Sequence, residues 1–155
     1  MRDKKNMSAV FIALAVLIID QLTKFIVLKN FLSGESLPVI ENIFHISLVF
    51  NRGFAFGIFS KKAASTWIWI YCFAIAVIAF LFYQNAQRQR KDTQVFLALI
   101  LGGAIGNLID RMRFGHVVDF LDFRIWPVFN IADSAITAGT ILLVLQILKS
   151  KKCIP

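Results

Sequence analysis

Charged residues are scarce in this chain of 155 residues. Only 17% of the residues are Asp, Glu, Lys or Arg, whereas 58% are hydrophobic, and the mean hydropathy is +0.71. A soluble domain of this size needs a more polar surface. The apolar residues also stand in long blocks, as a lipid bilayer requires. The composition therefore excludes an ordinary soluble protein, and the length predicts a single domain over residues 1–155.

Several other features are rare or missing. Of the two cysteines, Cys72 falls in an apolar block and Cys153 beside a basic tail, which argues against a disulfide between them. Neither His45 nor His116 has a Cys or His partner at metal-ligand spacing, so we expect no metal and no cofactor. The N-terminal apolar run has no small-residue cleavage site and is interpreted as a retained span. No serine lies in a G-x-S-x-G elbow, which disfavours a covalent nucleophile.

Four segments are long enough to cross a bilayer core of roughly 30 Å, at about residues 8–28, 64–83, 94–112 and 131–148. Nine of the 17 Lys and Arg form three short clusters: Arg2, Lys4 and Lys5; Arg88, Arg90 and Lys91; Lys149, Lys151 and Lys152. Four spans put all three clusters on one side, so the positive-inside rule predicts that both termini are cytoplasmic. This placement explains the net charge of +8 without a nucleic-acid partner.

Two loops would then face outward. The first, about residues 29–63, contains the strictly alternating segment 44–48, which predicts a half-buried strand. Residues 51–53 are predicted to turn, and residues 54–59 to return as a second strand. Since a lone hairpin is marginal in water, it should rest on the bilayer or on the helices. The second loop, about residues 113–129, is short and holds two aspartates.

Polar residues occur near the outer ends of the first and third spans. Charge is costly in hydrocarbon, so Asp20 and Lys24 are functional candidates. They could equally form a structural ion pair that braces the mouth of the bundle, with Lys24 reaching to the headgroups. Asn107, Asp110 and Arg111 follow three glycines that predict close helix packing. Taken alone, these residues favour a helix-end ion pair over a catalytic role.

Two further aspartates lie in unlike surroundings. Asp119 has apolar neighbours, which raise the pKa of a buried carboxyl group. Asp133 begins the fourth span, where the helix dipole favours the ionised form. Such a pair can divide acid and base roles in activating water. Asp133 could instead be an ordinary first-turn acid, with Asn130 as a helix cap. The residues alone do not select this pair over the other aspartates.

Five motifs in this order resemble the lipoprotein signal peptidase family, also called signal peptidase II. They are Asp20-Gln21-x-Thr23-Lys24, Asn51-x-Gly53-x-Ala55-Phe56, Gly102-Gly103-Ala104-x-Gly106-Asn107-x-x-Asp110-Arg111, Val117-Val118-Asp119-Phe120 and Phe129-Asn130-x-Ala132-Asp133. The resemblance spans nearly the whole chain. One departure is the short spacing of 13 residues between Asp119 and Asp133.

The resemblance implies a monomeric aspartyl endopeptidase of the bacterial inner or plasma membrane. Its fold would be an all-α bundle of four transmembrane helices with a small extracytoplasmic β-cradle. It would cut diacylglyceryl-modified prolipoproteins just before the lipidated cysteine, in contact with membrane lipids, and globomycin would block it. The catalytic pair would be Asp119 and Asp133, with Asp122 left unmarked. The residues expected to bind substrate or order the site are Asn51, Asn107, Asp110, Arg111, Asn130, Asp20 and Lys24.

Two alternatives come from other functional classes. Asp20, Lys24, Asp110 and Arg111 could form a proton or ion relay. The inner halves of the spans are nearly bare of charge, which disfavours a continuous path. The aromatic second span and the outer hairpin could instead belong to a non-catalytic membrane assembly factor.

Overall fold

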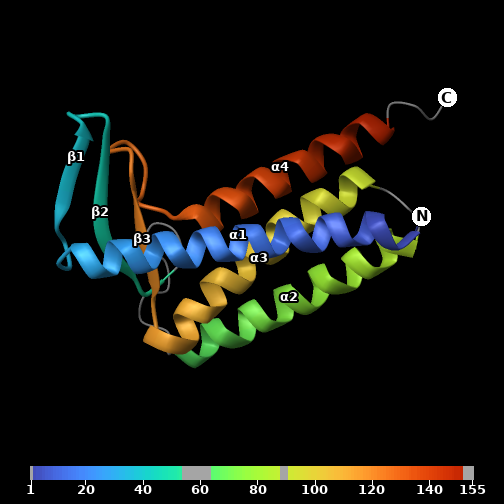
Figure 1. Cartoon of the computed structure of the whole chain (residues 1–155), viewed down its shortest axis with the longest axis horizontal. Coiled ribbons are helices and arrows are strands. Elements are labelled where there is room, and N and C mark those ends of the chain that lie inside the picture. Colours follow the sequence, from blue (N-terminus) through green and yellow to red (C-terminus); the bar gives the residue numbers. More distant parts are fainter. Residues whose placement is uncertain (1, 54–63, 88–90, 152–155) are drawn as a thin grey trace.

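Four long helices and one small sheet form the computed structural model, which describes residues 2–53, 64–87 and 91–151. The elements are α1 (Arg2–Asn30), β1 (Ser36–Ile40), β2 (Phe44–Asn51), α2 (Ala64–Gln87), α3 (Lys91–Phe114), β3 (Val117–Asp122) and α4 (Ile131–Lys151). The helices run lengthwise and the sheet lies at one end of the bundle (Figure 1). All four helices are long and apolar enough to span a membrane, as predicted.

The outward surface of the helices is apolar, as a bilayer requires. Phe11, Trp69, Phe73 and Leu148 are all more than half exposed. Hydrocarbon contains no water to satisfy backbone groups, so a continuous helix is the simplest way for such a segment to cross. The same exposure would be unfavourable for a protein in water.

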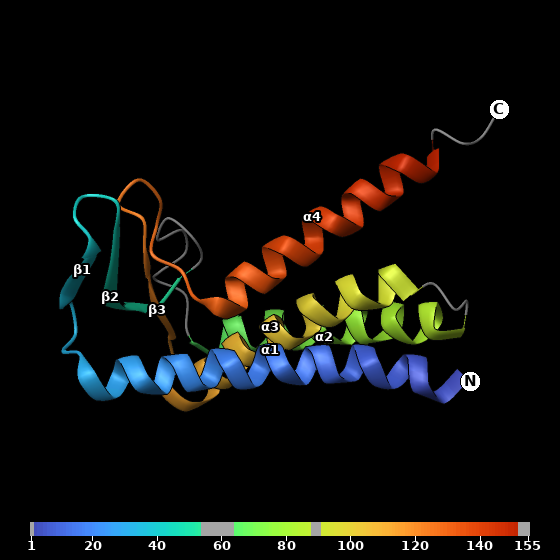
Figure 2. The same cartoon turned by 45° about the horizontal axis from the view of Figure 1, so that its top comes forward.

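Helix α3 is the central helix and packs against α1, α2 and α4. A Cβ atom on Gly102 would lie 2.5 Å from the carbonyl oxygen of Ala13 in α1, and one on Gly103 would collide with the carbonyl oxygen of Ala132 in α4. The predicted role of these glycines in close packing is therefore confirmed. Figure 2 shows α4 diverging from α1 towards its C-terminal end, whereas its contact with α3 continues. A Cβ atom on Gly139 would lie 2.6 Å from the carbonyl oxygen of Phe96, and Thr93 Oγ1 donates to Gln146 Oε1 at 2.8 Å.

The sheet has three antiparallel strands in the order β1-β2-β3. The predicted strand at 44–48 forms part of β2, whereas the proposed return strand at 54–59 lies outside the described residues. Strands β1 and β3 were not predicted, and the second outer loop in fact carries β3. Residues 117–120 are buried on both faces, so β3 shows none of the alternation that marks a half-exposed strand.

The strand geometry sets the direction of Asp119. Val118 and Phe120 pack with Val27 of α1 and Leu48 of β2 in a small buried core. Successive side chains of a strand point to opposite faces. Asp119 therefore points away from the face that Val118 and Phe120 occupy.

Candidate active site

Asp119 is almost completely buried and receives two amide hydrogen bonds. Asn51 Nδ2 donates to Oδ2 at 2.9 Å, and Asn130 Nδ2 donates to Oδ1 at 2.7 Å. Asn51 pairs with Val117 across the sheet, so Asp119, two residues further along, is its diagonal neighbour on the same face. Burial and the negative charge of Asp133 raise the pKa of Asp119 to about 7, although both amide donors oppose the shift.

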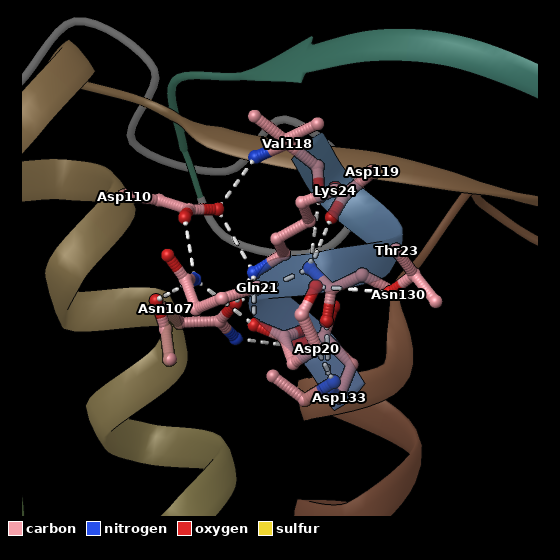
Figure 3. Close-up of polar contacts among 12 residues, drawn as sticks. Asp20, Gln21, Thr23, Lys24, Asn107, Asp110, Val118, Asp119, Asn130 and Asp133 are labelled. Atoms are coloured by element: carbon pink, nitrogen blue, oxygen red, sulfur yellow. Dashed lines mark hydrogen bonds and ion pairs between the residues drawn. The ribbon is translucent and has the colours of Figure 1, made fainter. Parts of the chain in front are cut away.

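Asp133 lies in the first turn of α4, near enough to Asp119 of β3 to raise the pKa of that residue. Its Oδ1 accepts a hydrogen bond from Asn107 Nδ2 at 2.8 Å, and its backbone N–H donates to Asn130 Oδ1 at 2.9 Å. Asn130 is thus the N-cap of α4, as the sequence suggested, and also a bridge. Its Oδ1 holds the backbone of Asp133 while its Nδ2 holds the Asp119 carboxylate. Figure 3 shows Asn130 between Asp119 of β3 and Asp133 of α4.

Lys24 is buried at the centre of a charged cluster. Its Nζ lies 2.9 Å from Asp20 Oδ2 and 2.8 Å from Asp110 Oδ2, and it donates to Asn107 Oδ1 at 2.9 Å. The predicted i,i+4 pair of Asp20 and Lys24 is present. The expectation that Lys24 reaches to the headgroups is wrong, because Asp110 supplies a second carboxylate that holds the ammonium inside at 2% exposure. Asp110, near the end of α3, thus forms its ion pair with Lys24 of α1.

The cluster also fixes the ends of the elements that carry the two aspartates. Asp20 Oδ1 accepts the backbone N–H of Ala132 at 2.9 Å, one of the N-terminal amides of α4 that no helical carbonyl can satisfy. Asp110 Oδ2 accepts the backbone N–H of Val118 at 3.1 Å, beside Asp119. Asp20, Lys24 and Asp110 therefore hold in place the start of α4 and the start of β3, the two elements that carry Asp133 and Asp119.

Gln21 is a member of this cluster to which the sequence reasoning gave no role. Its Nε2 donates to Asp110 Oδ1 at 3.0 Å and to the carbonyl oxygen of Gly106 at 3.2 Å. Gly106 is needed at this point, since a Cβ there would lie 2.6 Å from Asp20 Oδ2. The only sequence feature that pointed to Gln21 was its position within the Asp20–Lys24 motif.

Arg111 is buried and turns to the segment after β2. Its Nη2 donates to the carbonyl oxygen of Gly53 at 2.7 Å, and Gly53 N–H donates to Asn51 Oδ1 at 3.0 Å. The predicted turn at 51–53 is therefore held from both sides. Asn51 needs this support because its other amide atom binds Asp119.

Asp122 belongs to a separate network within the sheet. Its carboxylate accepts hydrogen bonds from Ser47 Oγ at 2.9 Å and from the backbone N–H of Arg124 at 2.9 Å. Burial opposes the shift, but these donors lower the pKa of Asp122 below its usual value. The structure thus separates Asp122 from the Asp119–Asp133 pair.

Comparison with known proteins identifies the family. A family model described as signal peptidase (SPase) II matches residues 12–149. The chain belongs to the signal peptidase II family. The resemblance seen in the five motifs is therefore confirmed, and this signal peptidase II chain is a peptidase and a multi-pass membrane protein.

Relatives of this signal peptidase II chain agree over nearly its full length. The lipoprotein signal peptidase of Moorella thermoacetica is 49% identical over 143 residues, which cover 92% of this chain and 93% of that protein. The lipoprotein signal peptidase of Halothermothrix orenii is 42% identical over 141 residues, covering 91% and 95%. A solved structure described as a bacterial membrane enzyme at 1.9 Å resolution is 37% identical, with a TM-score of 0.82 over 92% of this chain and 93% of that chain.

Proposed function

We propose that this chain removes signal peptides from diacylglyceryl-modified prolipoproteins, with Asp119 and Asp133 as the catalytic pair. The substrate class is supported by relatives that are lipoprotein signal peptidases. The catalytic assignment is carried by one observation, the Asn130 bridge that joins the Asp119 carboxylate of β3 to the backbone N–H of Asp133 in α4. The scissile bond in this proposal is the one before the lipidated cysteine.

The proposed mechanism uses the two carboxyl groups in different protonation states. Two close carboxylates resist double ionisation, and burial favours the proton on Asp119. Asp133 lies at a helix N-terminus, which favours the ionised form. Asp133 takes a proton from water, the hydroxyl oxygen bonds to the scissile carbonyl carbon, and Asp119 gives its proton to the developing oxyanion. On collapse, Asp133 returns its proton to the leaving amine and Asp119 recovers one from the intermediate.

This mechanism predicts an alkaline limit on activity. Asp119 is competent while protonated, so its contribution is present below a pH of about 7 and is lost as the pH rises through that value. The charged groups that act on it are Asp133 from α4 and Lys24 from α1. Cleavage at saturating substrate should fall about tenfold per pH unit above this limit. A profile measured in vesicles that stays flat to pH 9 would contradict the assignment.

A second expectation concerns the lipid on the substrate. Acyl chains lying in the bilayer add apolar contact that a bare peptide lacks. A purified enzyme in vesicles should therefore cut the diacylglyceryl-modified precursor at least about tenfold more efficiently than the unmodified one. Mass spectrometry of the product should show a new N-terminal cysteine. Equal cleavage of both precursors would rule out lipid recognition, while no cleavage of either would remove the proposed function.

The proposed orientation places both termini in the cytoplasm of a bacterial inner membrane and the site near the outer face. The polar cluster binds the start of β3 through Asp110, and the sheet lies at one end of the bundle (Figure 1), which supports an active site at one membrane surface. The grouping of the basic residues into three clusters that four spans would put on one side of the membrane supports the direction. Occupation of the same site by globomycin, and a monomeric state, are parts of this proposal.

An ion pathway has less support. The buried charged side chains in the described part of the chain all belong to the cluster and the sheet: Asp20, Lys24, Asp110, Arg111, Asp119 and Asp122. A conducting path would need polar groups through the full depth of the bundle.

A further inference from the structure

Helix α2 supplies no residue to the site described so far, but one of its side chains reaches it. Tyr71 lies about two turns from the start of α2. It is half-buried with Ile78 and Phe82, whereas Trp69 and Phe73 are 74% and 73% exposed. This spacing turns Tyr71 toward α3. Figure 1 shows the first turns of α2 beside the end of α3, where Arg111 lies.

Tyr71 contacts the arginine directly. The guanidinium carbon of Arg111 lies 5.5 Å from the centre of the Tyr71 ring, within cation–π range. The phenol is close enough to interact electrostatically with both Asp119 and Asp133. Tyr71 thus contacts Arg111 and lies within electrostatic range of Asp119 and Asp133.

From Arg111 the contacts continue to Asp119 without a break. Arg111 Nη2 binds the Gly53 carbonyl at 2.7 Å, Gly53 N–H binds Asn51 Oδ1 at 3.0 Å, and Asn51 Nδ2 binds Asp119 Oδ2 at 2.9 Å. Arginine has a planar head whose donors point in fixed directions. A rotation of the guanidinium would therefore release the Gly53 carbonyl and loosen the turn that presents Asn51.

We propose that Tyr71 is a positioning residue of the active site, which holds the Arg111 guanidinium and thereby fixes the Asn51–Gly53 turn against Asp119. The inference rests on the proposed function of the aspartate pair. It assigns α2 a part in the site, through a residue outside the five sequence motifs.

The test is Tyr71→Leu, assayed with lipidated precursor in vesicles. A small misplacement of a catalytic group lowers turnover without weakening ground-state binding, so kcat should fall about tenfold with KM unchanged. A weaker Asn51 hydrogen bond also leaves the pKa of Asp119 higher, because that bond opposes the upward shift. The alkaline limb of the pH profile should move up by about half a pH unit. Loss of packing alone would not move that limb.

Phe82→Leu is the matched control, since it shortens another half-buried aromatic residue on the same helix. It should leave both kcat and the pH profile unchanged. In the Arg111→Lys background, Tyr71→Leu should add little, because the contact is already lost. Tyr71→Phe, which keeps the ring, should show the same shift at smaller size and serves if the Leu variant does not fold.

Three outcomes would overturn the inference. In the first, Tyr71→Leu has the same kcat and pH profile as Phe82→Leu; in the second, the losses in kcat caused by Tyr71→Leu and Arg111→Lys multiply in the double variant. In the third, Tyr71→Leu raises KM and leaves kcat normal. Loss of cleavage in Asp119→Asn beside a normal Tyr71→Leu enzyme would remove this inference alone. An active Asp119→Asn enzyme would instead remove the proposed function.

Discussion

Replacing Asp119 by Asn is expected to reduce cleavage of a lipidated precursor by about a thousandfold or more. The amide has the shape of the carboxyl group but a single acceptor oxygen, so only one of the two donors, Asn51 or Asn130, retains its partner. The amide also cannot give a proton to the oxyanion. Asp133→Asn should have an effect of the same size, because an amide cannot take the proton of the attacking water. Turnover is measured by release of signal peptide at pH 6.5, where the parent Asp119 holds its proton.

Asp122→Asn is the control within the same strand. Asp122 is also buried and hydrogen-bonded, but its partners are Ser47 and Arg124 in the sheet network. It should keep near-normal activity and the same alkaline limb. If Asp119→Asn or Asp133→Asn retained near-normal turnover, the catalytic pair would be wrong. A loss in Asp122→Asn as large as in Asp119→Asn would show that the assay reports damage to the sheet.

Replacing Lys24 by Met should destabilise the fold by about 3–5 kcal/mol, because removal of one partner leaves buried charges without compensation. Asp20 and Asp110 would face each other across an apolar side chain, each at 1% exposure or less. Asp20 holds the start of α4 and Asp110 the start of β3, so activity should fall with stability. Thermal unfolding in detergent and cleavage in vesicles measure the two effects.

Lys29→Met is the control, since Lys29 is exposed at the end of the same helix. It should unfold at nearly the temperature of the parent chain. Neutralising the partners with Asp20→Asn and Asp110→Asn in the Lys24→Met background should recover part of the lost stability. Equal unfolding temperatures for Lys24→Met and Lys29→Met would mean that the buried cluster contributes no net stability.

The membrane spans were predictable because lipid leaves the chain few choices. A segment of about 20 apolar residues must satisfy its own backbone groups, and a helix does so locally. The packing role of Gly102 and Gly103 was predictable for a similar reason, since small residues permit close contact whichever helix is the neighbour. Neither inference requires knowledge of a distant part of the chain.

The site required such knowledge, and the sequence could not supply it from physical pattern alone. Asp119 and Asp122 are three residues apart in β3, so their side chains point to opposite faces of the strand. Without a predicted strand, their faces could not be distinguished, and the family motif made the choice. The partner of Asp110 was also hidden, because Lys24 lies on another helix. Tyr71 gave no signal at all within an aromatic, apolar span.

The bond from the Ala132 amide to Asp20 has a consequence for biosynthesis. The two residues are 112 positions apart and belong to the first and last helices. The ribosome translates α1 first and α4 last, so the Asp20 carboxylate lacks the Ala132 amide until α4 has been translated. A nascent chain that stops before residue 131 lacks α4 and therefore Asp133, the proposed catalytic partner of Asp119. Under the proposed mechanism, cleavage therefore cannot begin before the last helix has been translated.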